Sequence, residues 1–374
     1  MNFVGLKARS RFYVSDSLHW RIAIFRIAFL FASRKLGRMS ESLSQPSMEW
    51  SLQYFEAINS EIDSMTRGDS SGIGELVKES LTGGRRTRAL LTMLWCEALS
   101  GDFRPAVPVA AAYEMAHAAA LIEDDLIDGS RSKKGGATFP VKYGVPKAVL
   151  VSNALLFYAP SFLAKAARSG LSPECVSKLL DLLGQCGRLT AEGEFLDLEM
   201  TRMVEVPESL YYKMISMKTG ALVGASSASG SIMGSRRSEK KLVDAAYSFG
   251  EALGMAYQIW DDLQDYFGEE AVSGKAIFWD LKTGKKSLPL IQLLKSITRD
   301  ERELVKTITH NPESLGSADA IQVRSLMVKY DSREYCNRAT RKFLKKAEVC
   351  LSPLESSKAK DRLVQIIQYL SIRS

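Results

Sequence analysis

Two clusters of aspartates hold the residues of this sequence that are best suited to chemistry. They are Asp124, Asp125 and Asp128, and Asp261, Asp262 and Asp265. In each cluster the first and last aspartates are four residues apart and would share one face of a helix, where like charges repel. Carboxylates without thiolate or imidazole partners suit Mg²⁺, which also binds substrate phosphates. One cluster alone could be an exposed helix end, but two, each after an apolar run, predict a shared magnesium site.

Basic residues in other segments could bind an anion beside these clusters. Gly83 and Gly84 precede Arg85, Arg86 and Arg88 at an expected helix start. Backbone amides, the helix dipole and guanidinium groups can together bind a phosphate there. Taken alone, the segment could equally be a helix cap followed by a solvated basic turn. Further cations are Lys133, Lys134, Lys218, Lys275, Lys285 and Lys286.

The elements that must position these residues are helices. Helical periods recur at about 48–66, 85–100, 105–128, 146–168, 172–200, 207–234, 238–267, 286–308, 318–330, 331–350 and 355–372. Glycine and proline mark the breaks between them. Strict alternation of apolar and polar residues is not found, so no sheet is predicted. We predict an all-α fold with one large helical domain over residues 47–374.

The charge distribution excludes one class of partner. The chain has 374 residues with 50 Lys and Arg, 43 Asp and Glu and a net charge of +7. Eight basic residues and one acid lie in the first forty positions, so 42 basic and 42 acidic residues remain in the body. A neutral body gives no support for nucleic-acid binding. The five scattered cysteines indicate free thiols in a reducing compartment.

Residues 1–46 form a basic extension with three possible roles. The segment is rich in Arg, contains Ser and has few acids, as mitochondrial or plastid transit peptides do. Its apolar stretch at 18–33 contains Arg21 and Arg26 and is shorter than the roughly 20 residues that span a membrane, so it could instead be a peripheral membrane anchor. A true start at Met39 or Met48 is the third possibility. The expected location is therefore the cytoplasm, or a mitochondrion or plastid.

Taken in order, these segments resemble the trans-prenyltransferase family of isoprenyl and polyprenyl diphosphate synthases, and geranylgeranyl diphosphate synthases most of all. Residues 83–88 look like GGKRxR, 117–128 like HxxxLIxDDxxD, 193–197 like GQxxD, 218–219 like KT, 258–265 like QxxDDxxD, and 274–289 like the segment that follows. The chain departs from this pattern at Glu194, where the family has Gln. It also has Lys133 and Lys134 in place of an Arg pair, which removes bidentate phosphate contacts.

The resemblance implies an isoprenoid synthase bundle with a central active-site cavity. There, isopentenyl diphosphate would be condensed with an allylic diphosphate with the help of several Mg²⁺ ions. It also implies a homodimer. Asp124, Asp128 and Asp261 would bind the metal, and Asp125, Asp262 and Asp265 would support them. Lys133, Lys218, Lys275 and Gln258 would hold the allylic diphosphate. Arg85, Arg88, His117 and Lys134 would hold isopentenyl diphosphate, Thr219 would border the reacting carbons, and Lys285 would also bind substrate.

The helix before the first aspartate cluster would set the product length, because in this family it lines the tunnel for the growing chain. Ala119 and Ala120 lie where bulky residues stop elongation early, Ala116 lies one turn deeper, and Tyr113 could be the floor. Each helical turn climbs roughly 5 Å, about one isoprene unit. We therefore predict geranylgeranyl diphosphate, the C20 compound, with longer polyprenyl chains as the alternative. The small residues could also serve only for close helix packing.

Two other functions compete with chain elongation. A class I terpene cyclase shares the helical fold and an aspartate cluster, but it does not need a site for isopentenyl diphosphate. A non-catalytic partner subunit often lacks one of the two clusters. The basic segment at 83–88 and the two intact clusters favour the elongating enzyme.

Overall fold

The computed structural model describes residues 49–66, 71–133, 136–168, 170–235, 239–268, 278–310 and 316–372. These residues belong to one unit of the chain, Ser47–Ser374. The extension predicted for residues 1–46 lies outside the described residues, as do Lys134 and Lys275. The location of the protein and the role of the extension therefore stay predictions.

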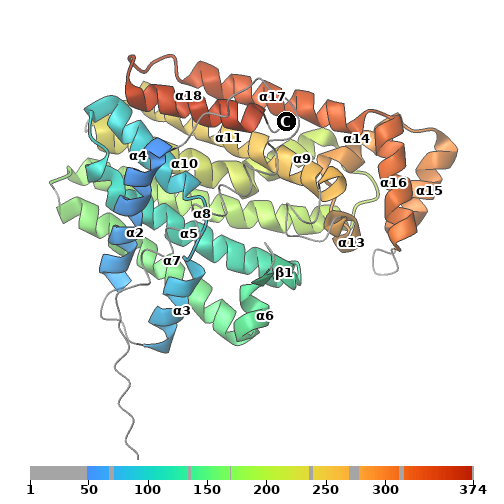
Figure 1. Cartoon of the computed structure of the whole chain (residues 1–374), viewed down its shortest axis with the longest axis horizontal. Coiled ribbons are helices and arrows are strands. Elements are labelled where there is room, and N and C mark those ends of the chain that lie inside the picture. Colours follow the sequence, from blue (N-terminus) through green and yellow to red (C-terminus); the bar gives the residue numbers. More distant parts are fainter. Residues whose placement is uncertain are drawn as a thin grey trace, which may run out of the picture. The chain divides into compact units, whose positions relative to one another are not determined.

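Helices make up most of this unit, which confirms the predicted all-α fold (Figure 1). The first half contains η1 (Glu49–Ser51), α2 (Leu52–Thr66), α3 (Gly72–Ser80), α4 (Thr87–Ser100), η2 (Arg104–Ala106), α5 (Val107–Ile127), α6 (Phe139–Tyr143), α7 (Val145–Arg168) and α8 (Pro173–Thr201). The second half contains α9 (Glu208–Ile215), the π-helical turn η3 (Ser216–Gly220), α10 (Ala221–Ser235), α11 (Lys240–Phe267), α13 (Trp279–Thr283), α14 (Leu288–Ser296), α15 (Arg299–His310), α16 (Ser317–Lys329), α17 (Ser332–Cys350) and α18 (Lys358–Ser371).

The structure corrects the prediction that the chain contains no sheet. Strands β1 (Ser132–Lys133) and β2 (Gly136–Ala137) pair antiparallel, with Ser132 opposite Ala137. A two-residue strand is too short to show alternation, so periodicity cannot reveal it. For the same reason the periodicity did not indicate the short helices α3, α6 and α13, and it merged α14 with α15.

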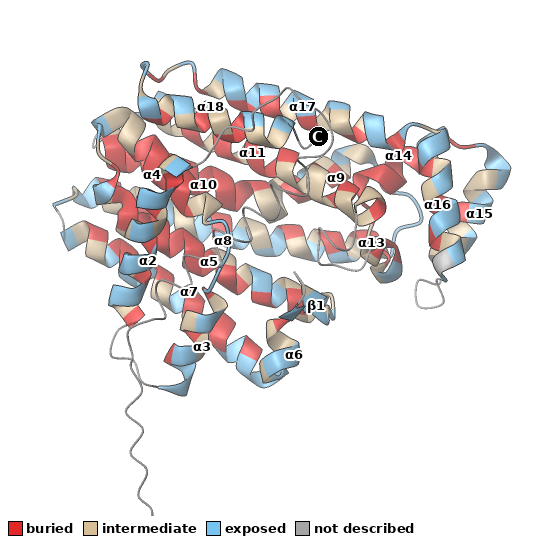
Figure 2. Cartoon of the chain, in the orientation of Figure 1, coloured by how far each residue is buried: buried red, intermediate tan, exposed pale blue. Residues whose placement is uncertain are grey.

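Helix α10 forms the centre of the core. Every residue from Ala221 to Gly234 is buried (Figure 2), as expected of a helix without a polar face. It packs against α4, α5, α8 and α11. The contacts are close because its residues are small: a Cβ atom at Gly230 would lie 2.1 Å from the carbonyl oxygen of Thr92 on α4. Small residues thus let the surrounding helices approach this one closely.

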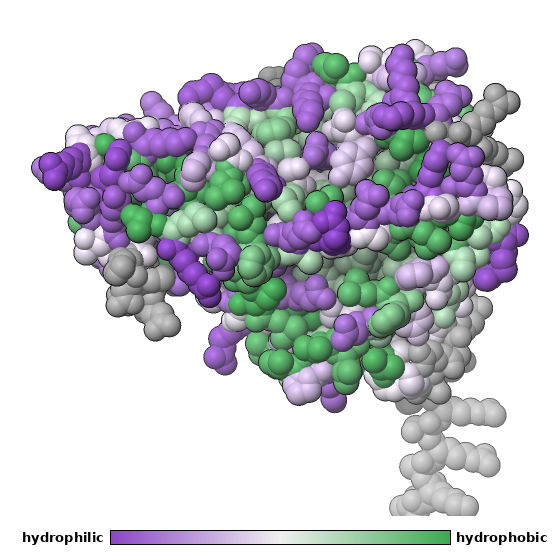
Figure 3. All heavy atoms as spheres, turned by 180° about the vertical axis from the view of Figure 1, so that it is seen from behind, coloured by the Kyte–Doolittle hydropathy of each residue, from purple (hydrophilic) through white to green (hydrophobic). Residues whose placement is uncertain are grey.

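Helices α5 and α7 are, by length and composition, apolar enough to cross a membrane. In α5, which carries the first aspartate cluster, 72% of the apolar window is buried inside the protein, as in the core helix of a globular protein. In α7 only 39% is buried. Its exposed apolar side chains are Val145, Val149, Leu150, Leu156 and Phe157. Apolar side chains also gather on the lower part of the surface seen from behind (Figure 3).

Candidate active site

The first aspartate cluster lies at the C-terminal end of α5, and the β1–β2 hairpin follows directly. The hairpin brings Lys133 back to the cluster, where its Nζ lies 2.8 Å from Asp125 Oδ1 and 3.6 Å from Asp124 Oδ2. A lysine eight residues away in sequence thus neutralises part of the charge that Asp124 and Asp125 place together. The predicted proximity of Lys133 to this cluster is therefore found.

Lys218 is surrounded by three carboxylates. Its Nζ lies 2.6 Å from Glu194 Oε2, 2.9 Å from Asp197 Oδ2 and 3.4 Å from Asp124 Oδ1. Burial alone would lower the pKa of Lys218, but the charges of Asp197, Asp124 and Glu194 raise it well above its usual value. The ammonium group therefore stays charged at the junction of α5, α8 and the π-helical turn.

Thr219, the next residue, connects the same turn to the second aspartate cluster. Its hydroxyl donates to Gln258 Oε1 at 2.8 Å, and Gln258 Nε2 donates to Asp262 Oδ1 at 2.9 Å. A π-helical turn widens the helix locally and often marks a functional site. Here Lys218 contacts the first cluster directly, and Thr219, the next residue, is connected to the second cluster through Gln258.

A glycine on α8 allows this turn to come close. A Cβ atom at Gly193 would lie 2.3 Å from the backbone nitrogen of Lys218. Such a distance is far shorter than a normal contact, so only glycine permits α8 and the turn to pack in this way. The close approach places Glu194 and Asp197 of α8 against the Lys218 ammonium.

Lys285 contributes a further cation from the segment before α14. Its Nζ lies 2.6 Å from Asp128 Oδ2 and 3.9 Å from Asp197 Oδ2. Burial and the nearby Lys218 ammonium lower the pKa of Lys285, but the carboxylates of Asp128 and Asp197 outweigh them and raise it. Lys133, Lys218 and Lys285 therefore converge on the first cluster, as cations that hold a diphosphate there would have to.

The aspartates of the second cluster have different surroundings. Asp262 is buried and accepts a hydrogen bond from the Tyr211 hydroxyl at 2.6 Å. Burial and the charge of Asp280 raise the pKa of Asp262 to about 7, against the effect of the hydrogen bonds from Tyr211 and Gln258. Asp265 accepts the backbone N–H groups of Trp279 and Asp280 at 2.9 and 3.1 Å, which holds the start of α13.

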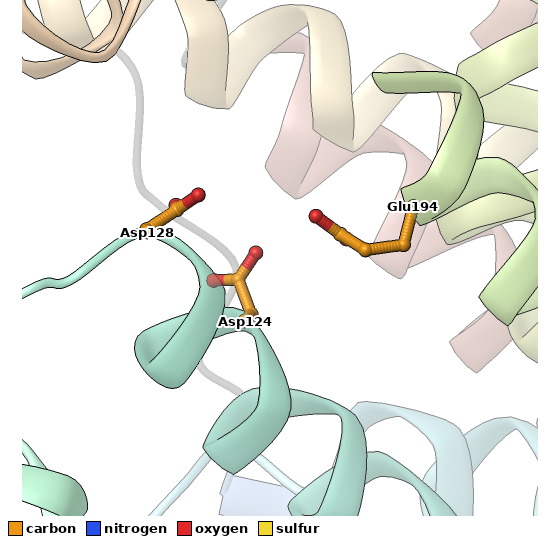
Figure 4. A group of neighbouring side chains, drawn as sticks. All are labelled: Asp124, Asp128 and Glu194. Carbon is orange, nitrogen blue, oxygen red and sulfur yellow. The ribbon is translucent and has the colours of Figure 1, made fainter. Parts of the chain in front are cut away.

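Three carboxylates form a group that could bind a divalent cation. Oxygen atoms of Asp124, Asp128 and Glu194 all lie within 4.8 Å of one another and point toward a common space (Figure 4). Glu194 Oε1 is buried and has no hydrogen-bond partner. Such hard oxygen ligands fit Mg²⁺ or Ca²⁺. Asp261 does not belong to this group, so its predicted part in metal binding stays a prediction.

The basic segment before α4 has a defined geometry. Gly83 and Gly84 have φ angles of 80° and 84°, in the left-handed region that glycine adopts without strain. Arg86 pairs with Glu114 of α5 at 3.4 Å, and Glu114 also accepts the backbone N–H of Ala89 at 3.1 Å. This arginine is thus structural.

The two arginines expected to bind isopentenyl diphosphate lie on either side of Arg86. Arg85 is exposed, and Arg88 is half-buried with its Nε lacking a partner. His117 is half-buried on α5. Among the described residues, neither Arg85 nor Arg88 has a recorded contact with the aspartate network. The isopentenyl site assigned to these residues therefore stays a prediction.

The candidate tunnel residues lie on α5 as predicted. Ala116 and Ala119 are buried, and Ala120 is half-buried. Tyr113 is fully buried, and its hydroxyl lies 2.7 Å from Ser229 Oγ of α10. A hydrogen bond between two core helices holds this ring in place.

Sequence reasoning missed Glu194, Asp197 and Tyr211 as members of the site. Glu194 and Asp197 are three residues apart and so share a face of α8, a spacing that could have identified them as a pair beside the lysines. Tyr211 has no such signal, because its contact with Asp262 depends on how α9 packs against α11.

Comparisons with known proteins agree with this geometry. The profile of the polyprenyl synthetase family matches residues 71–324. The geranylgeranyl diphosphate synthase of Sulfolobus acidocaldarius is 32% identical over 285 residues, which cover 74% of this chain and 85% of that protein. The geranylfarnesyl diphosphate synthase of Aeropyrum pernix is 30% identical over 294 residues, which cover 77% and 90%.

A solved structure shows the same fold. The crystal structure of polyprenyl synthase from Caulobacter crescentus CB15, complexed with calcium and isoprenyl diphosphate, matches with a TM-score of 0.80 at 25% identity. The match covers 89% of this chain and 100% of that one. The range matched by the family profile, residues 71–324, contains both aspartate clusters of this chain. The chain therefore belongs to the polyprenyl synthetase family, and it is a trans-prenyltransferase that synthesises isoprenyl diphosphates.

Proposed function

We propose that this enzyme makes the C20 compound geranylgeranyl diphosphate from isopentenyl diphosphate and farnesyl or shorter allylic diphosphates. The observation that carries the proposal is the wall on α5. Three alanines, at 116, 119 and 120, are the small side chains of α5 before the first aspartate cluster, and Tyr113, one turn before Ala116, is hydrogen-bonded to Ser229. A rigid aromatic ring about three turns from the reacting end would stop a chain of that length.

The mechanism follows from the charged network. Bound Mg²⁺, held by Asp124, Asp128 and Glu194 and, as the resemblance implies, by Asp261, would neutralise charge on the departing diphosphate. Lys133, Lys218 and Lys285 would bind the same diphosphate and stabilise its growing charge from fixed positions.

No side-chain base is required for the rest of the reaction. The isopentenyl double bond attacks the allylic carbocation, and the released diphosphate accepts the proton that the product loses. In that step the protein only has to bind isopentenyl diphosphate. We assign this binding to Arg85, Arg88 and His117.

We also propose that the protein is a homodimer. The apolar stripe of α7 is exposed to solvent in the single chain, and an apolar patch of this extent marks an interaction site. A second copy is the occupant that we propose, because most oligomers of soluble proteins are symmetric homo-oligomers. The dimer would cover α7, which packs against the catalytic helix α5.

Product analysis tests the main proposal. The purified enzyme is incubated with Mg²⁺, isopentenyl diphosphate and, in turn, dimethylallyl, geranyl, farnesyl and geranylgeranyl diphosphates, and the products are separated by chromatography. We expect C20 from the first three primers and no extension of the fourth. Efficient extension of geranylgeranyl diphosphate would establish a longer-chain synthase instead. Products made without isopentenyl diphosphate would indicate a cyclase, and no product at all would indicate a partner subunit.

Three variants test the tunnel wall. Ala120→Phe should shorten the main product to farnesyl diphosphate, because the new ring fills the space beside the first cluster. Tyr113→Ala should lengthen the product, because it removes the floor. Ser229→Ala removes only the hydrogen bond to Tyr113 and should leave C20 as the product. Unchanged product lengths in both of the first two variants would show that these residues do not line the tunnel.

A further inference from the structure

A cavity of about 190 Å³ lies outside the aspartate network. Its walls come from residues 204–207 after α8, from Lys286, from α14 and from Arg302 of α15. Most of the lining is apolar and includes Val206, Leu290 and Leu294. None of the residues assigned above to substrate or metal lines this cavity.

Lys286 is a buried cation without a counter-charge. Its side chain lines the cavity, and the residue is only 8% exposed. It makes no hydrogen bond or ion pair with any residue in the described part of the chain. Burial lowers the pKa of Lys286 accordingly. Burying an ammonium group without a partner costs free energy, and an anion bound beside it would offset that cost.

Arg302 adds a second cation with unused hydrogen-bonding capacity. Its Nε is buried and has no partner. The carboxylates nearby are already paired: Glu205 lies 3.2 Å from Lys306, and Glu208 lies 2.9 Å from Lys295. Within the described ranges, the acids beside the cavity therefore do not neutralise Lys286 or Arg302.

We propose that this cavity is a binding site for a small amphiphilic anion. A phosphate or diphosphate group would lie between Lys286 and Arg302, and a short apolar group would pack against Leu290, Ile291 and Leu294. A phosphate with one short branched chain is of a size to fit this space.

Two sources could supply this chemistry, and binding measurements distinguish them. Full-length protein in EDTA, which removes divalent cations, is titrated by calorimetry with isopentenyl monophosphate and, separately, with inorganic diphosphate. Hydrogen–deuterium exchange then locates the bound ligand. We expect slower exchange in peptides from α14 and α15, distinct from any change in peptides that contain Asp124. Tighter binding of the monophosphate would show that the apolar wall takes part, and tighter binding of diphosphate would assign the site to an inorganic anion.

Lys286→Met and Arg302→Leu test the two cations independently. Each should weaken the binding seen at α14 and α15 by roughly tenfold to a hundredfold, the usual effect of losing a charged hydrogen bond. Lys329→Met makes the same change at an exposed ion pair on α16 and should leave binding unchanged. Lys286→Met should also keep or raise the melting temperature of the ligand-free protein, because it removes an unpaired buried charge.

Two results would overturn the proposal. One is the absence of any ligand-dependent protection in α14 and α15. The other is wild-type affinity in both Lys286→Met and Arg302→Leu. Either would mean that the cavity holds only water. Because Arg302 is not adjacent to Lys285, its variant remains informative if Lys286→Met disturbs the active site.

Discussion

Lys218 shows how one residue can organise an active site. Its ammonium group contacts carboxylates from α5 and α8, and the next side chain, Thr219, contacts Gln258 of α11. A cation at this junction reduces the repulsion among acids that must lie close enough to share a metal ion. When a metal and a diphosphate bind, the same ammonium group is in place to contact the diphosphate.

Glu194 gives the first prediction. Glu194→Gln restores the residue usual in the family and keeps the size of the side chain, but it removes one carboxylate from the group with Asp124 and Asp128. We expect the affinity for Mn²⁺, measured by electron paramagnetic resonance without substrate, to fall by about 10- to 100-fold.

The control for this prediction is Glu192→Gln, at an exposed residue of the same helix that pairs with Arg188. It should bind Mn²⁺ as the wild type does. Equal affinities in all three proteins would show that Glu194 is not a metal ligand.

Residue types and spacing predicted much of this site and failed at identifiable points. The two aspartate clusters and Lys218 could be proposed because their motifs are local in sequence, and the part of Asp261 stays a prediction. Tyr211 could not be assigned a role, because its partner Asp262 lies on another helix and the contact depends on tertiary packing. Lys286 is next to Lys285 in the sequence, and only the structure shows that Lys285 contacts Asp128 whereas Lys286 lines the cavity.

At the scale of the elements, helix α9 is connected to α14 and α17 through the carboxylate of one residue, Glu208. Glu208, in its first turn, accepts hydrogen bonds from Tyr335 of α17 at 2.7 Å and from Lys295 of α14 at 2.9 Å. Tyr212, one turn further along α9, donates at 2.8 Å. Burial raises the pKa of Glu208, but the three hydrogen bonds outweigh it and lower the pKa.

This lowered pKa predicts the pH dependence of stability. Glu208 contributes stability above its unfolded pKa of about 4.3, and the contribution disappears as the pH falls through the folded value. Glu208→Gln should lower the free energy of unfolding at neutral pH by roughly 1 to 3 kcal/mol. The difference from wild type should shrink below about pH 4. Urea unfolding at several pH values measures both effects.

Glu303→Gln is the matched control for Glu208. Glu303 is an exposed acid of α15 with one distant lysine contact, at 3.8 Å, and surface pairs of this kind contribute little. If Glu208→Gln lowered the free energy of unfolding by the same amount at every pH, the ionised Glu208 carboxylate would not be the source of the stability.

Long elements were predictable and short ones were not. Helices such as α8 and α11 contain enough turns for apolar periodicity to show. Helices α3, α6 and α13 have nine, five and five residues. For α13 the stabilising contact is the Asp265 carboxylate at its N-terminus, which lies in another helix. A short helix that is stabilised by contacts from other helices cannot be recognised from its own residues.

For the whole molecule, the exposed stripe of α7 predicts the state of assembly. We expect the wild type to sediment as a dimer in analytical ultracentrifugation. The double variant Leu150→Glu and Phe157→Glu should sediment as a monomer, because it places two charges in an apolar interface. Phe157 is 80% exposed in the single chain, so the substitution itself should not disturb the fold.

The control places the same charge elsewhere on the surface. Val328→Glu changes an apolar residue of α16 that is 62% exposed, and it should remain dimeric. A wild-type monomer, or a dimeric double variant, would contradict the proposed interface.

The π-helical turn limits which deletions the sequence of this protein can tolerate. Such a turn contains one more residue than the α-helical turn that it replaces. Deleting one residue from Ser216–Gly220 would leave a regular helix running from α9 into α10, and it would move side chains of the turn around the helix axis by up to about 100°, the step of one residue. Lys218 and Thr219 could then no longer face the two clusters. The reaction therefore depends on the length of the chain here as well as on its side chains.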